Sequence, residues 1–187
     1  MKKQKGRMAT RTLSCCALLA ALSVVLARLL IPMPDSSTRF SIEAVPIFIA
    51  GMLFGPLAGG LVGFVADATG TLFSAFGFNP IFCVPPILYG VCGGLFRSFL
   101  AKGVNVPRLT VSILPPVVFG SILYQSMTLA YAYPKMGTFM QTFLFNLATR
   151  SIQFAITATL DVLVIYLLFK ARIFTRLGLW TPRKRSN

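Results

Sequence analysis

Long apolar stretches alternate with short polar ones along most of the chain. The clear apolar runs cover residues 12–31, 81–101, 110–133 and 143–169. Each is near the length of about 20 residues at which an apolar α-helix crosses the hydrocarbon core of a bilayer. The pattern therefore predicts membrane-spanning helices at these four places.

The stretch from residue 44 to residue 76 admits two interpretations. It could form one long helix, or a short helix over 44–54 that turns at Gly55-Pro56 into a second helix over 57–75. One helix gives five spans and places the basic C-terminus outside, against the positive-inside rule, whereas two return it to the cytoplasm. We adopt two helices, hence six spans. The short helix would cover only about 16 Å, so it must sink into the fold.

Composition agrees with a chain that lies mainly in lipid. Of its 187 residues, 56% are hydrophobic and 12% are charged, whereas soluble proteins have about 25% charged residues. The first run begins like a signal peptide, but its length and Arg28 favour a retained helix. We expect an all-α integral membrane protein of one domain. Its six-helix bundle would cover 12–172, between basic cytoplasmic tails at 1–11 and 173–187.

The formal net charge of +14 is explained by membrane orientation. The 18 Lys and Arg residues form short clusters beside apolar runs, without the amphipathic or aromatic-interleaved face of a nucleic-acid-binding protein. Six spans place fourteen of them on the inner side and leave Arg39 and Lys135 outside. Arg28 and Arg150 then lie within the membrane. We expect lipid around the chain and no nucleic-acid partner.

The inventory of reactive side chains argues against an enzyme. The chain has no histidine, and its only acids are Asp35, Glu43, Asp67 and Asp161. This removes histidine acid–base chemistry and the usual zinc ligand sets, so we expect no metal and no cofactor. A membrane enzyme would need Asp67 and Asp161 to cooperate from different helices. No G-x-x-x-x-G-K-[ST] loop occurs, so any ATP must be hydrolysed by another subunit.

Four charged side chains at membrane depth, Arg28, Asp67, Arg150 and Asp161, each call for a partner or a polar cavity. A charge there costs about 2.5 to 3.5 kcal/mol on insertion scales. Arg28 lies near the outer end of the first helix, Asp67 at mid-depth in the third and Arg150 in the outer part of the sixth. One interpretation is an internal ion pair of Asp67 with either arginine. The other is an outward-facing pocket, in which the arginines bind ligand carboxylates and Asp67 accepts an N–H/NH₂ edge.

Helical spacing favours the pocket. Asn146, Arg150, Gln153 and Thr157 form one polar stripe that continues to Asp161, and such a stripe must face the bundle interior or a cavity. Asp161, in the inner half, is better explained as structural. Gln125 reaches the same outer depth as Arg150. Asn79, with its neighbouring aromatic residues, and the polar loop over 31–43 would lie at the mouth, where the loop could act as a lid.

Small residues recur at positions where helices could touch closely. Gly55, Gly59 and Gly63 recur every four residues. A second group of glycines, at 90, 93 and 94, would allow close contact by the fourth helix. Because lipid gives helices no hydrophobic reason to associate, close backbone contact supplies the attraction. Ala17 and Ala21 form a similar row on the first helix, which could meet another subunit.

Three strings carry a resemblance to a known family. They are ALLAALSVVLARLL in the first helix, VPIFIAGMLFGPLAGGLVGFVADATG, and NPIFCVPPILYGVCGGLFR. Together they resemble the substrate-binding S component of energy-coupling factor (ECF) vitamin transporters, in its folate-type branch. The similarity is good over residues 17–97, although Asn79-Pro80 and Pro85-Pro86 depart from the family pattern. The last two helices agree only in their general pattern.

The resemblance implies a six-helix protein of the bacterial cytoplasmic membrane, with a vitamin pocket near the outer surface and no covalent chemistry. It implies docking on a transmembrane scaffold protein and two ATPases through an A-x-x-x-A row, which falls here on Ala17 and Ala21. Folate would suit the pocket, its two carboxylates binding Arg28 and Arg150 and its pterin binding Asp67. The alternatives are another vitamin or anionic precursor, and a structural protein without a ligand.

Overall fold

Helices make up nearly all of the chain that the structure describes. The computed structural model describes residues 10–28, 31–32, 39–40, 42–72, 80–132 and 138–180. Its elements are α1 (Thr10–Arg28), β1 (Ile31–Pro32), β2 (Arg39–Phe40), α2 (Ala44–Phe54), α3 (Pro56–Leu72), η1 (Pro80–Cys83), α4 (Val84–Leu95), α5 (Arg97–Leu100), α6 (Val106–Pro115), η2 (Pro116–Tyr124), α7 (Gln125–Ala132), α8 (Phe139–Lys170) and α9 (Ile173–Arg176). In these residues α5 continues α4, and α6, η2 and α7 form one rod. Six rods, of which α2 is the shortest, therefore precede α9 in the described residues.

The two-helix interpretation of residues 44–76 is confirmed. Gly55 ends α2 with φ at 101°, and its N–H donates to the carbonyl of Gly51 at 2.8 Å. Pro56 then begins α3, where its missing N–H and fixed φ are tolerated. The residues of α2 from Val45 to Leu53 are all buried, so this short helix does sink into the fold as its length requires.

The expected all-α fold is interrupted by one short pair of strands. In the loop between α1 and α2, β1 and β2 pair antiparallel, with Ile31 opposite Phe40 and Pro32 opposite Arg39. Backbone groups without a helix still need hydrogen-bond partners, and strand pairing supplies them. The remainder of this loop, at 33–38 and 41, lies outside the described residues. The lid function therefore stays a prediction.

The fifth rod changes its winding halfway. Pro115 and Pro116 adjoin at the junction of α6 with η2, a stretch of π-helix. A proline lacks the N–H that an α-helix needs at that position, and wider turns absorb the mismatch. Gly120, within η2, lies against α4, where an added Cβ would be 3.2 Å from Cδ1 of Leu88 and 3.4 Å from Cα of Pro85.

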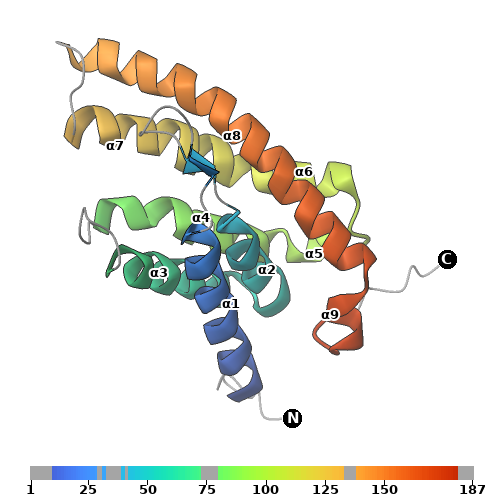
Figure 1. Cartoon of the computed structure of the whole chain (residues 1–187). Helices are drawn as coiled ribbons and strands as arrows, with labels where there is room; N and C mark the ends of the chain where they lie inside the picture. The colour runs from blue at the N-terminus through green and yellow to red at the C-terminus, as the bar shows by residue number, and fades with distance from the viewer. Residues whose placement is uncertain are drawn as a thin grey trace.

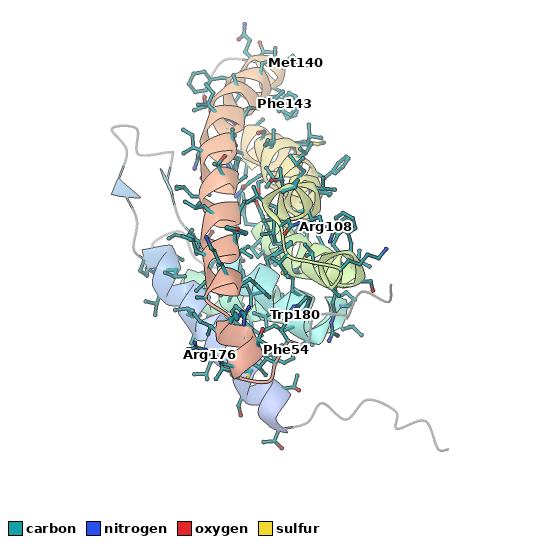
Figure 2. The ribbon with its side chains drawn as sticks, turned by 90° about the vertical axis from the view of Figure 1, so that its right-hand side faces the viewer. Phe54, Arg108, Met140, Phe143, Arg176 and Trp180 are labelled. Carbon is teal, nitrogen blue, oxygen red and sulfur yellow. The ribbon has the colours of Figure 1, made fainter. Side chains whose placement is uncertain are left out.

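Two layers make up the molecule. In Figure 1, α1, α2, α3 and α4 form the lower layer, and the α6–α7 rod lies beside α8 in the upper one. The layers meet where η2 packs on α4 and where α8 packs on α2. Figure 2 shows Met140 and Phe143 at one end of α8, and Arg176 and Trp180 in the segment that follows its other end.

Glycines bring α3 and α4 into backbone contact. A Cβ at Gly59 would overlap the carbonyl oxygen of Gly90, and one at Gly63 would overlap that of Pro86. The small-residue row predicted for these two positions therefore does pack helix on helix. Gly55 was predicted as part of this row, and its backbone does meet α4, since a Cβ added to Gly94 would lie 2.5 Å from the carbonyl carbon of Gly55. A Cβ added to Gly55 itself would meet nothing within 4 Å, and the positive φ there favours glycine where α2 ends.

Lipid-compatible surface covers much of the outside. The α6–α7 rod over Val106–Ala132 and α8 over Phe139–Lys170 are long and apolar enough to cross a membrane. Thr12–Arg28, Ala44–Phe54 and Pro80–Leu95 are shorter apolar helices. Many large apolar side chains on these elements are exposed, as expected where the surrounding medium is hydrocarbon. Which side of the membrane each terminus faces stays a prediction.

Candidate functional site

Asp67 is held where the end of α3 meets the start of α4. Its side chain is half-buried, and Oδ2 accepts a hydrogen bond from the Cys83 thiol at 2.9 Å. Cys83 immediately precedes α4, so the carboxylate lies by the N-terminal end of that helix. The positive end of the helix dipole favours a negative charge there. Since a carboxylate has about four acceptor positions, one thiol leaves room for further donors.

Arg28 reaches the same end of α3 from α1. It is the last residue of α1, and its Nη2 donates to the backbone carbonyl of Gly70 at 2.6 Å. Gly70 comes three residues after Asp67, which is less than one helical turn. The side chain of Arg28 is exposed. The structure thus places Arg28 against the last turn of α3, within one helical turn of Asp67, which the sequence had placed deeper than Arg28.

Arg150 lies in the other layer and is held by neutral groups. Its half-buried side chain donates from Nη1 to Oε1 of Gln125 at 3.0 Å, and its guanidinium carbon lies 6.0 Å from the centroid of the Phe154 ring. Gln125 begins α7, which contacts η1. Because η1 ends at Cys83, the elements that hold Arg150 adjoin those that hold Asp67.

The polar stripe on α8 faces the interior, as predicted. Asn146, Gln153, Thr157 and Asp161 are all buried, with Asn146 only 6% exposed. Among the described residues, Nδ2 of Asn146 has no hydrogen-bond partner. Asn146 precedes Arg150 by about one turn. An unpaired amide donor therefore lies next to an arginine that no carboxylate of the described chain neutralises.

The internal ion pair is not what holds Asp67 or Arg150. Asp67 is bound by a thiol and Arg150 by an amide, and the hydrogen bond of Arg28 goes to a peptide carbonyl. Gln125, expected at the pocket from its depth, is the hydrogen-bond partner of Arg150, and its contact with a ligand stays a prediction. These partners come from distant parts of the chain. Nothing in the spacing of Asp67 and Cys83, sixteen residues apart, indicated their contact.

The remaining predicted positions have different outcomes. Asn79 lies outside the described residues. Asp161 is 2% exposed, and neither of its oxygens has a hydrogen-bond partner among the described residues. On α1, Ala17 and Ala21 are exposed, whereas Ala20 is buried against the bundle. The row predicted to meet another subunit therefore points away from the fold, and its partner stays a prediction.

Solved structures resemble this fold over most of its length. FolT bound with folic acid is 26% identical, with a TM-score of 0.72, and the likeness covers 86% of this chain and 94% of that one. ThiT from Listeria monocytogenes is 17% identical, with a TM-score of 0.64, over 91% and 97%. That second likeness shows a shared fold alone. No curated protein matches the chain.

A family model extends the likeness to the sequence. The model of the ECF-type riboflavin transporter S component matches residues 7–171. This confirms the resemblance to an S component, but the family description names a different vitamin from the predicted folate. Because the match covers most of the chain, the protein belongs to this family: it is the substrate-binding S component of an ECF vitamin transporter, a multi-pass protein of the cell membrane and not an enzyme.

Proposed function

We propose that this S component binds folate at the end of the bundle where α1, α3 and α8 present Arg28, Asp67 and Arg150, with Gln125 of α7 beside Arg150. The observation that carries the proposal is Arg150. It is half-buried in a membrane-spanning helix, its partners are an amide and an aromatic ring, and the donor of Asn146 beside it is unpaired. A guanidinium in such surroundings binds a carboxylate more strongly than it would in water.

Each part of folate has a matching group. One carboxylate of the glutamate tail would bind Arg150 and Asn146, whereas Arg28, which lies within one helical turn of Asp67, borders the pterin end of the site. The N–H/NH₂ edge of the pterin would donate to the free acceptor positions of Asp67. The likeness to FolT bound with folic acid supports this assignment, because it is the more similar in sequence of the two solved structures compared.

Delivery of the vitamin would require other subunits. We propose that the protein docks on a scaffold protein and two ATPases through the exposed row of Ala17 and Ala21, and that ATP hydrolysis there drives release to the inside. Alanines allow close approach of two helix backbones in lipid. The vitamin itself would undergo no covalent change.

Folate binding to the purified chain tests the proposal. We expect saturable binding by titration calorimetry, with Arg150→Gln weakening the affinity roughly ten- to hundredfold, as for the loss of a charge-assisted hydrogen bond. Arg97→Gln is the matched control, because Arg97 is an exposed residue of α5. Absence of folate binding to the wild-type chain would refute the proposal.

Riboflavin is the second candidate, because the matching family description names it. Riboflavin carries no carboxylate, so its affinity should not depend on the charge of either arginine. Titration of wild-type and Arg150→Gln protein with both vitamins separates the two candidates. Tight riboflavin binding that survives Arg150→Gln, without folate binding, would replace folate by riboflavin.

A further inference from the structure

The thiol of Cys83 is directed across the α3–α4 interface. Cys83 occupies the position before the first turn of α4, where polar side chains usually cap their own helix. It makes no such cap. The thiol instead donates a hydrogen bond to Asp67 on α3, and the side chain is 2% exposed. The thiol therefore serves the neighbouring helix and not its own.

The backbone fixes this contact within one turn. Gly63, one turn before Asp67, packs against Pro86, three residues after Cys83. A Cβ at Gly63 would lie 2.7 Å from the carbonyl carbon of Pro86, which is well inside normal carbon contact distances of about 3.5–4.0 Å. The two helices thus pack backbone to backbone one turn away from the contact, and this packing places the Cys83 thiol beside the Asp67 carboxylate.

We infer that Cys83 is a positioning residue for vitamin recognition, holding one oxygen of Asp67 so that the carboxylate presents its remaining acceptor positions to a ligand. This inference rests on the proposed folate site. Without the hydrogen bond, the Asp67 carboxylate could rotate about its two side-chain torsions. Such rotation would lower its affinity for a ligand, because the two donors of the ligand must be bound at the same time. The neutral thiol orients Asp67 and leaves its negative charge in place, whereas a lysine or arginine at the same position would neutralise that charge.

Affinity for folate in Cys83 variants gives the first test. We expect Cys83→Ala to weaken folate binding about fivefold, as for loss of one ordinary hydrogen bond, and Cys83→Ser to restore it because a hydroxyl also donates. A purely structural role predicts a different pattern, with loss of thermal stability in the unliganded protein and no rescue by serine. Equal folate affinities of Cys83→Ala and wild type would overturn the inference.

A double-mutant cycle locates the effect at Asp67. In an Asp67→Asn background, Cys83→Ala should cause no further loss of folate affinity, because the carboxylate it positions is gone. Binding of the pterin-free half, 4-aminobenzoyl-glutamate, should be the same in Cys83→Ala and wild type. Additive losses in the cycle, or equal losses for the two ligands, would show that Cys83 does not act through Asp67.

One measurement reports on the hydrogen bond without depending on ligand affinity. The S–H stretching band of this thiol, identified as the difference between wild type and Cys83→Ser, should move when Asp67 is changed to Asn. An unmoved band would contradict the hydrogen bond itself. If the wild-type chain binds no folate, the proposed function fails, while this band still reports on the Cys83–Asp67 contact.

Discussion

Replacing Gly63 by alanine should uncouple α3 from α4 and damage the site one turn away. The added Cβ would lie 2.7 Å from the carbonyl carbon of Pro86 and 3.0 Å from the nitrogen of Ile87, and would overlap the Pro86 oxygen. Because these are backbone atoms, no side-chain rotation relieves the contact. Normal spacing of about 3.5–4.0 Å requires the helices to separate by about 1 Å.

The expected loss of stability follows from this displacement. Overpacked sites usually lose about 1–3 kcal/mol, and a membrane protein has little besides close packing to hold α3 on α4. For a chain of this size the melting temperature should fall by several degrees. The 2.9 Å contact of Cys83 with Asp67 would open by a similar distance. Folate affinity should therefore fall together with stability.

Gly70→Ala is the matched control in the same helix. A Cβ there would meet nothing within 4 Å, and the backbone carbonyl that binds Arg28 is kept. Alanine favours a helix over glycine by up to about 1 kcal/mol, so this variant should be as stable as wild type or more so. The melting temperatures of the two variants can be measured by heating each protein in detergent with a thiol-reactive dye, which reacts with the buried Cys16 and Cys83 as they become exposed. Equal melting temperatures for Gly63→Ala and Gly70→Ala would refute the packing described for α3 and α4.

Three further variants test other parts of the structure. Asp161→Asn should leave thermal stability unchanged or raised, because it removes a buried carboxylate whose oxygens have no partner among the described residues; a fall of several degrees would contradict this. Ala21→Leu should keep folate binding by the isolated chain but abolish uptake with the ATPase module, since a larger side chain blocks close helix approach; full uptake would exclude docking at this row. Trp180→Ala should lose about 3 kcal/mol of stability, because the ring is 6% exposed and packs edge-on against Phe169 at 5.5 Å; an unchanged melting temperature would show that this contact is unimportant.

The helices were predictable because membrane depth constrains their length. The break at Gly55-Pro56 followed from charge bias and turn chemistry, and α2 begins and ends at the predicted residues. The paired strands β1 and β2 were not foreseen, since two residues each give too short a pattern. Neither was the π-helical stretch after Pro115, because adjacent prolines signal a disturbance of a helix without specifying how its turns adjust.

Within the site, the sequence identified faces but not partners. Periodicity along α8 correctly placed Asn146 and Arg150 toward the interior, because residues on one side of a helix share a direction whatever lies opposite. The groups that hold Asp67 and Arg150 come from other elements, η1 and α7. Such contacts depend on how the helices pack against one another, and the residue spacing within a single helix does not determine this packing. Gln125 was chosen for its depth, and the structure adds that it binds Arg150, which the spacing of the two residues did not indicate.

The neutral partners also explain how opposite charges can serve one ligand without cancelling each other. If Asp67 paired directly with Arg150, the site would be satisfied in the absence of any ligand, and a vitamin would have to break the pair before binding. Cys83 holds the carboxylate on the α3–α4 side, and Gln125 holds the guanidinium on the α7–α8 side. Each partner orients its charge and leaves it uncompensated. An elongated ligand with an N–H/NH₂ edge at one end and carboxylates at the other supplies both missing counterparts in a single binding event.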